Sequence, residues 1–209
     1  MKVAIVDHGG SNLLSLCKAV SSVGATPIVL SSPEDLTLCS SAILPGVGNF
    51  EACSKSLTRD GWFDALHDFS TTLERPLLGI CLGMQLLSAQ SSELMLNSGD
   101  GTAQGLSLID GSVTRLKTSD SHRIPHVGWN SVSHNGDSLF RDIPSMTDFY
   151  FVHSYAFHTS NDSETIGTCS YGETFAAVVR KDRIVGTQFH PEKSSRAGLA
   201  LLRNFVELI

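Results

Sequence analysis

Strand-like and helix-like segments alternate along roughly the first eighty residues, and this alternation restricts the chain to few folds. Val3 to Val6 is an unbroken apolar run, which is typical of a strand buried on both faces. Helical spacing follows at residues 12–23 and ends at Gly24. Further strands are expected at 27–30, 41–44 and 77–80, and further helices at 50–69, with a break at Gly61, and at 84–94. Alternation of this kind builds βαβ units, so it predicts a parallel sheet.

The second half of the chain has a different pattern, in which strands follow one another directly. They are expected at 105–116, 126–133, 149–157, 165–170 and 175–188, with turns at Gly111, 135–136 and 181–182 and a last helix over 196–209. The predicted fold class is therefore α/β: an open, mostly parallel central sheet flanked by helices, with a partly antiparallel second half. No repeat or long linker divides the chain, so a single domain over residues 1–209 is expected.

Composition and charge exclude several classes of protein. The formal net charge is −6, so the basic footprint of a nucleic-acid-binding protein is absent, and no run of Lys or Arg indicates a membrane surface. No apolar stretch approaches the roughly 18 residues of a membrane span, and the N-terminal apolar run is too short for a signal peptide. The five cysteines form no CxxC pair, so neither zinc nor a dithiol motif is indicated. A reduced cytoplasmic protein without metal or cofactor is expected.

One cysteine stands at a sharp corner between an expected strand and an expected helix. Residues 79–85 read GICLGMQ, so Cys81 has a glycine two residues before it and another two residues after it. A nucleophile elbow requires such small neighbours because its turn is tight. At this corner, Cys81 would point out of the carboxyl edge of the sheet, where open α/β sheets bind ligands. The N-terminus of the following helix would favour its thiolate form over the thiol. The backbone N–H of Leu82 would be placed to donate to an oxyanion. The alternative is a buried structural cysteine, as expected for the other four.

Two further segments supply what such a nucleophile needs. His190 follows an expected strand, and Glu192 lies two residues on, so both side chains face the same side and the carboxylate can orient the imidazole. Alternatively, His190 only caps the closing helix. Residues 44–50 read LPGVGNF, and their two glycines allow backbone N–H groups to approach a ligand. The segment has no lysine, so it is not a phosphate-binding P-loop. Two interpretations of it remain: a second donor to the oxyanion, or a simple turn before a helix.

Together, PGVG at 45–48, GICLGMQ at 79–85 and HPE at 190–192 resemble the class I, triad-type glutamine amidotransferase family, in the family's order and at about its separations. PHVGWN at 125–130 and YFVHSY at 150–155 are similar to one group within it, the glutaminase subunits of imidazole glycerol phosphate synthases in histidine biosynthesis. The resemblance implies that Cys81 attacks the side-chain amide of glutamine, that His190 transfers protons, and that Glu192 orients His190.

The resemblance also implies a partner and further site residues. The partner is a cyclase subunit with a (β/α)₈ barrel, which forms a heterodimer with this subunit. It uses the ammonia to make imidazole glycerol phosphate and an aminoimidazole carboxamide ribotide. Oxyanion donors are expected at Val47, Gly48 and Leu82; contacts to the substrate glutamine at Gly46, Gln85, His153, Ser154 and Tyr155; and partner contacts at Asn12, Trp129, Asn130, Tyr150 and Lys193. Trp129 could equally be a packed core side chain, and His126 a core or an interface histidine.

The chain departs from the family in the loop after the first strand. Family members often carry Asp-Tyr-Gly-x-Gly-Asn there, whereas this chain has His8 in place of the tyrosine and Ser11 in place of the second glycine. We expect this loop to face the partner.

Three alternatives remain open. The first is a glutaminase for another synthase, such as those making anthranilate or guanylate, and PHVGWN argues against it. The second is a stand-alone cysteine peptidase or γ-glutamyl hydrolase, which Gln85 argues against. The third is a non-catalytic binding subunit, which would have lost a member of the triad, and none is lost here.

Overall fold

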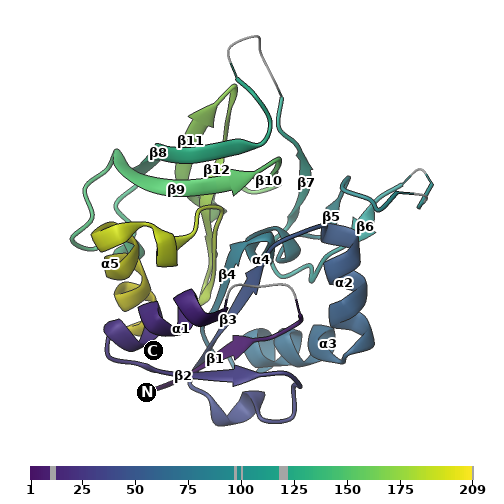
Figure 1. Cartoon of the computed structure of the whole chain (residues 1–209), viewed down its shortest axis with the longest axis vertical. Helices are drawn as coiled ribbons and strands as arrows, with labels where there is room; N and C mark the ends of the chain where they lie inside the picture. The colour runs from purple at the N-terminus through teal and green to yellow at the C-terminus, as the bar shows by residue number, and fades with distance from the viewer. Residues whose placement is uncertain (10–12, 97, 100, 118–121, 209) are drawn as a thin grey trace.

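A computed structural model of the chain describes residues 1–9, 13–96, 98–99, 101–117 and 122–208 (Figure 1). Its central sheet has the strand order β2-β1-β3-β4-β13-β12-β11-β8-β9. The strands that pair in parallel are β1 (Lys2–Val6), β2 (Thr26–Leu30), β3 (Ser41–Gly46), β4 (Leu77–Cys81) and β13 (Ile184–Thr187). The antiparallel extension is formed by β12 (Glu173–Lys181), β11 (Thr165–Tyr171), β8 (His126–His134) and β9 (Thr147–His153). The predicted α/β sheet with an antiparallel second half is confirmed.

Helices cover both faces of this sheet (Figure 1). On one face lie α1 (Leu13–Ser22) and α5 (Ser195–Val206); on the other lie α2 (Phe50–Arg59) and α3 (Trp62–His67). Side chains alternate along β1, so that Val3 and Ile5 join the first core while Ala4 and Val6 join the second. The predicted break at Gly61 is present, because this residue has φ +74 between α2 and α3.

A second, four-stranded sheet lies beside the first. Its order is β10 (Tyr155–Thr159), β7 (Gly111–Arg115), β5 (Gln90–Ser91) and β6 (Ala103–Gln104). The single strand expected over 149–157 is therefore wrong, because the chain changes sheets at Ser154. Burial alternates up to His153, but Ala156 and Phe157 are both buried, so the alternation is broken at this point. Short turns of 3₁₀ helix occupy Leu36–Leu38, Ser138–Phe140, Asp162–Glu164 and Pro191–Lys193, and a π-helical turn occupies Asp68–Thr72.

The helix expected over 84–94 is also wrong, since α4 spans only Leu82–Leu86. The reason is a set of long-range backbone bonds: the carbonyl of Leu86 accepts from Leu106 N–H at 2.7 Å, and that of Ser88 from Ser107 N–H at 3.0 Å. In a continuing helix, these carbonyls would accept from the N–H groups four residues further along the chain. Here they accept from residues 106 and 107 instead. The strand expected over 105–116 forms only in its second half, as β7. Residues 105–109 are not part of a strand, because their N–H groups bond to the end of α4 and the chain that follows it.

Within the described ranges, no helix combines the length and the apolar character needed to cross a membrane.

Candidate active site

The corner at Cys81 is a strained turn that only glycine neighbours permit. Cys81 ends β4 with φ +55 and ψ −108, a region that L-residues rarely adopt. A Cβ atom on Gly83 would lie 1.8 Å from the carbonyl oxygen of Leu44, and one on Gly79 would lie 2.5 Å from the carbonyl oxygen of Gly83. The backbone of α4 therefore packs directly on β3. The expected strand and corner are present, and a helix begins directly after the corner, although it is much shorter than expected.

His190 and Glu192 form a buried pair beside this corner. The Nδ1 atom of His190 lies 2.8 Å from Oε1 of Glu192, and both side chains are buried. The other ring nitrogen, Nε2, is buried and has no hydrogen-bond partner among the residues that the structure describes. The carboxylate thus orients the ring and leaves Nε2 for a reacting group.

The charge state of His190 is set by two neighbours that oppose the effect of burial. Burial disfavours the imidazolium, but Cys81 and Glu192 favour it more strongly and raise the pKa of His190 to about 9. His190 is therefore charged at neutral pH.

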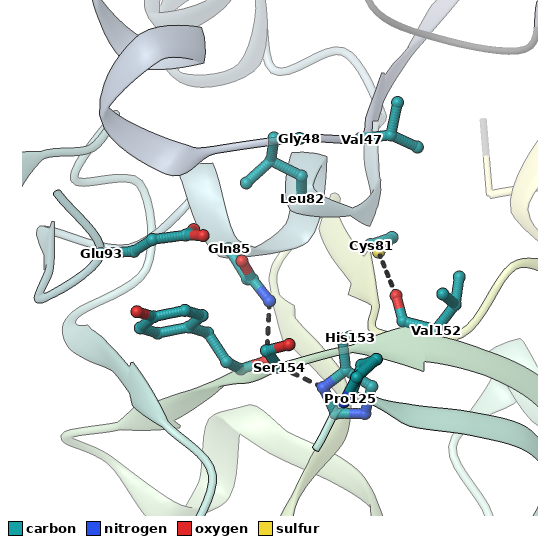
Figure 2. A pocket seen from close by; sticks show the side chains of 11 residues that line it. Val47, Gly48, Cys81, Leu82, Gln85, Glu93, Pro125, Val152, His153 and Ser154 are labelled. Carbon is teal, nitrogen blue, oxygen red and sulfur yellow. Dashed lines mark hydrogen bonds between the residues drawn. The ribbon is translucent and has the colours of Figure 1, made fainter. Parts of the chain in front are cut away.

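The thiol of Cys81 faces a cavity of about 250 Å³ (Figure 2). Sγ lies 3.7 Å from the carbonyl oxygen of Val152 and 3.8 Å from Nε2 of Gln188. In Figure 2, Val47, Gly48 and Leu82 form one wall and His153 and Ser154 the opposite wall. The cavity is smaller than the ~300 Å³ at which drug-sized pockets begin, so it suits a small ligand.

Gln85 lines the cavity, but its amide group is already in use. Its Nε2 donates to the carbonyl of Tyr155 at 2.8 Å and to Oε1 of Gln188 at 3.0 Å. Only its Oε1 is left for a ligand. Gln188 is a residue that the sequence analysis missed. It is buried and touches both Gln85 and Cys81, and its place two residues before His190 was the available signal.

Glu93 is the second residue that the sequence analysis missed. Its carboxyl group points into the cavity beside Gln85 (Figure 2). It accepts a hydrogen bond from Phe50 N–H at 3.0 Å, and burial raises its pKa. The signal was hidden because Glu93 fell inside the helix expected over 84–94, where it would have been one more helical residue.

The N-terminus of α2 holds the segment that carries Glu93. Asn49 Nδ2 donates to the carbonyl of Leu94 at 3.3 Å, and Glu51 Oε2 accepts from Met95 N–H at 2.6 Å. These residues directly follow the expected oxyanion segment 45–48. The oxyanion segment and the Glu93 segment are therefore connected through one helix end.

His153, Ser154 and Tyr155 all line the cavity, as expected for substrate contacts, but His153 has no free ring nitrogen. Its Nδ1 lies 2.8 Å from the carbonyl oxygen of Tyr155, and its Nε2 lies 2.9 Å from Nδ1 of His126. Gly46 does not line this cavity. It lines a smaller one of about 20 Å³ together with His190, Glu192 and Lys193. Direct contact of Gly46 with the substrate remains a prediction.

His8, where the chain departs from the family, reaches the oxyanion segment. Its Nε2 lies 2.8 Å from the carbonyl oxygen of Pro45, and its Nδ1 lies 3.4 Å from Sγ of Cys53. Since a carbonyl only accepts, His8 donates through Nε2 and holds the start of this segment. Ser11 and Asn12 lie outside the described residues.

Three of the expected partner contacts lie together on the surface. The Trp129 side chain is exposed, which excludes a core position, and it packs edge to face on Tyr150 with ring centroids 6.1 Å apart. Nζ of Lys193 lies 5.9 Å from the centroid of the Tyr150 ring. Asn130, the next residue along β8, is half-buried, and its Nδ2 donates to the carbonyl of Ser170 at 3.1 Å.

Comparison with known proteins identifies the family. A model of the class-I glutamine amidotransferases matches residues 4–208. The chain belongs to this family. It is 43% identical to imidazole glycerol phosphate synthase subunit HisH of Moorella thermoacetica, over 99% of this chain and 95% of the relative. It is 44% identical to subunit HisH 1 of Prochlorococcus marinus, over 99% of this chain and 97% of the relative.

Solved structures agree on the fold. A crystal structure of a glutamine amidotransferase superposes with a TM-score of 0.74 at 17% identity, covering 99% of this chain and 97% of the other. The resemblance to HisH-type glutaminase subunits, inferred from the sequence, is thereby confirmed at the level of family and fold.

The contact of Gly83 with Leu44 predicts a large cost for a single methyl group. Gly83→Ala should lower the free energy of unfolding by about 2–4 kcal/mol, because the clash is with backbone and cannot be relieved by a rotamer change. Denaturant unfolding measures this cost. Gly136→Ala is the control: Gly136 has φ +85, but a Cβ there would meet no atom within 4 Å, so this substitution should cost only the ~1 kcal/mol of the backbone conformation. Equal costs would contradict the packing argument.

The His190–Glu192 pair predicts a shifted titration. The NMR signal of the His190 ring should titrate well above pH 6.5, towards about 9, and Glu192→Gln should lower that midpoint by removing a stabilising charge. Since the folded pKa is raised, the pairing stabilises the fold fully below the unfolded pKa of ~6.5, and this contribution is lost as the pH rises towards 9. Glu207→Gln, on the surface, should leave the midpoint unchanged. A wild-type midpoint at or below 6.5 would contradict the assignment.

Proposed function

We propose that the chain hydrolyses glutamine to glutamate and ammonia and delivers the ammonia to the cyclase subunit of imidazole glycerol phosphate synthase, in histidine biosynthesis. The observation that carries this proposal is the oriented His190–Glu192 pair, which interacts with a thiol that opens onto a small cavity. The HisH names of relatives that span the whole chain support the pathway.

In the first half of the reaction, the Cys81 sulfur attacks the side-chain carbonyl carbon of glutamine, and the carbonyl oxygen becomes an oxyanion. Imidazolium His190 then gives its Nε2 proton to the amide nitrogen as the C–N bond breaks, and ammonia leaves. A glutamyl thioester on Cys81 remains. The raised pKa of His190 supports this role, because it keeps the acid protonated at neutral pH.

In the second half, neutral His190 takes a proton from water through Nε2. The resulting hydroxide attacks the thioester carbonyl, and the C–S bond breaks to release glutamate and the Cys81 thiolate. Glu192 holds the ring through Nδ1 in both halves. The net change is glutamine plus water to glutamate plus ammonia.

The oxyanion is stabilised in this proposal by the N–H of Leu82, the first residue of α4, and by N–H groups of Val47 and Gly48 on the same wall of the cavity. Gly48 has φ +106 and nothing within 4 Å of the position of a Cβ. This backbone therefore has room to turn its N–H groups towards the oxyanion.

The cavity also offers complements for the rest of a glutamine molecule. The Glu93 carboxylate is the partner we propose for the substrate's α-ammonium group, and Oε1 of Gln85 is the remaining acceptor beside it. Ser154 and Tyr155 provide backbone groups on the opposite wall. An acidic group at this end favours an amino acid over a simple amide.

This proposal gives a test that separates recognition from chemistry. Glu93→Gln should raise KM for glutamine roughly 10- to 100-fold, the value of one charge-assisted hydrogen bond, with little change in kcat. The matched substrate is glutaramate, which lacks the α-ammonium group. The variant should hydrolyse glutaramate as well as the wild type does. An equal loss on both substrates would show that Glu93 only shapes the cavity.

The partner we propose is a cyclase with a (β/α)₈ barrel that forms a heterodimer with this chain. Trp129, Tyr150 and Lys193 would form the centre of the contact, with Asn130 at its edge and Asn12 as a further contact outside the described residues. The small cavity of about 20 Å³ is lined by His190 and Glu192 of the triad and by Lys193 of this face. We propose that ammonia leaves along it to form imidazole glycerol phosphate and an aminoimidazole carboxamide ribotide in the partner.

The test of the function is glutamate release by the chain alone and with the cognate cyclase and its nucleotide ligand. We expect a strong rise with the partner, because Gly48 leaves the oxyanion segment free to rearrange on docking.

Cys81→Ala should abolish release of glutamate while keeping partner binding. Trp129→Ala should weaken binding, with Leu38→Ala, another exposed apolar residue, as the control. Glutaminase activity that ignores the cyclase would retain the triad and refute the partner.

Two broader proposals complete this assignment. We propose that residues 1–209 act as one glutamine amidotransferase domain, supported by a central sheet whose strands come from both halves of the chain. We also propose a cytoplasmic location, where a reducing environment keeps the nucleophilic thiol free.

A further inference from the structure

Two buried histidines lie next to the cavity and have no role in the chemistry above. His126 is the first residue of β8 and His153 the last residue of β9, and they are paired across the two strands. Both are almost completely buried, with 3% and 6% of their surface exposed. Their surroundings are aromatic: the His126 ring stacks on Tyr171 with centroids 4.0 Å apart, and the His153 ring packs edge to face on Phe175.

The hydrogen bonds around this pair fix the position of every ring proton. The carbonyl of Tyr155 can only accept, so His153 donates to it through Nδ1 at 2.8 Å. A neutral His153 then accepts at Nε2, and its partner at 2.9 Å, Nδ1 of His126, must be the donor. A neutral His126 in turn accepts at Nε2, where Nδ2 of Asn130 lies at 3.3 Å.

The orientation of Asn130 confirms that this chain of bonds runs in one direction. Its Nδ2 also donates to the carbonyl of Ser170 at 3.1 Å, and its Oδ1 accepts from Ser131 N–H at 2.9 Å. The amide therefore cannot be flipped without losing both bonds. All donors and acceptors from Asn130 to Tyr155 match when both imidazoles are neutral.

Protonation of either ring would break the chain. A charged His153 would turn Nε2 into a donor that faces the N–H of His126, and a charged His126 would face the amino group of Asn130. Burial and neighbouring histidines also oppose a positive charge. Burial together with His122 lowers the pKa of His126 to about 4. For His153, burial together with His126 and His190 outweighs the hydrogen bond to Tyr155, which favours the charged ring, and lowers the pKa to about 3. Burial is the largest cause for both rings.

The inner end of the chain is an atom on which the cavity depends. The Tyr155 carbonyl accepts from both His153 and Gln85, and Gln85 contacts Gln188, which contacts Cys81. The carbonyl lies just after Ser154, where the chain passes from one sheet to the other. A ring nitrogen that holds this carbonyl therefore fixes the cavity wall and the Gln85 amide together.

We propose that His126 and His153 are positioning residues for glutamine, acting as a pair of neutral imidazoles that holds the Tyr155 carbonyl and through it Gln85 and the Ser154 wall. This inference rests on the proposed glutaminase function. It assigns both rings to substrate binding and neither to proton transfer. The outer end of the pair lies at Asn130, which follows Trp129 of the proposed docking face in the sequence.

The kinetic test uses the complex with the cyclase and its ligand. His126→Phe keeps a flat ring between Tyr171 and Phe151 but removes both nitrogens. KM for glutamine should rise about tenfold, the value of a hydrogen bond lost from a buried network, while kcat stays within about twofold. His126→Asn offers an amide near the position of Nδ1 and should restore much of the lost affinity. A fall in kcat with unchanged KM would overturn the proposal.

The control is His134→Phe on the same strand. His134 also stacks on an aromatic ring, Phe140, with centroids 4.1 Å apart, but it lies far along β8 from the cavity. It should leave KM for glutamine unchanged. If both phenylalanine variants raise KM equally and lower the melting temperature equally, the effect is general destabilisation and the positioning role is refuted.

A second measurement does not depend on activity. In the free chain labelled with ¹⁵N-histidine, two of the eight histidines should be neutral Nδ1–H tautomers that do not titrate between pH 8 and 5. His126→Phe and His153→Asn should each remove one of these signals. Nε2–H tautomers, or titration near pH 6.5, would refute the inference whatever the activity. A complex that never releases glutamate, with these signals present, would instead refute the proposed function.

Discussion

The direct packing of the Gly83 backbone on the Leu44 carbonyl is the constraint on which the site depends. Because no side chain separates α4 from β3, the helix begins immediately after β4 and Cys81 must take a positive φ. The same closeness places the Leu82 N–H and the segment after β3 on one side of the cavity (Figure 2). The position of Cys81 is thus decided by backbone contacts, which side-chain motion cannot relax.

Much of this site was predictable from local patterns in the sequence. The glycines around Cys81 indicated a tight corner, and the two-residue spacing of His190 and Glu192 indicated a shared face; both follow from backbone geometry alone. The alternation of apolar runs likewise gave the parallel strands at the correct places. Such features need no knowledge of distant contacts.

The missed parts depend on long-range backbone bonds. Residues 87–109 have a helix-compatible sequence near their start, but bonds such as Leu106 N–H to Leu86 O replace the helical ones, and Glu93 thereby reaches the cavity. The break at Ser154 was hidden for a related reason, because the side chains of His153 and Gln85 satisfy the Tyr155 carbonyl in place of a strand partner. His8 contacts Pro45 across 37 positions of sequence, which no periodicity reveals.

Of the other four cysteines, three are buried and Cys17 is half-buried, and this has a practical consequence for labelling. Burial raises the pKa of Cys17 and Cys39, and raises that of Cys53 and Cys169 to about 12, so at neutral pH these thiols hold almost no reactive thiolate. Cys81 alone among the five opens onto the ligand cavity in the part of the chain that the structure describes. An electrophilic glutamine analogue should therefore place a single adduct on the intact protein. A fluorophore or affinity handle attached in this way would report on one defined position without removal of any other cysteine.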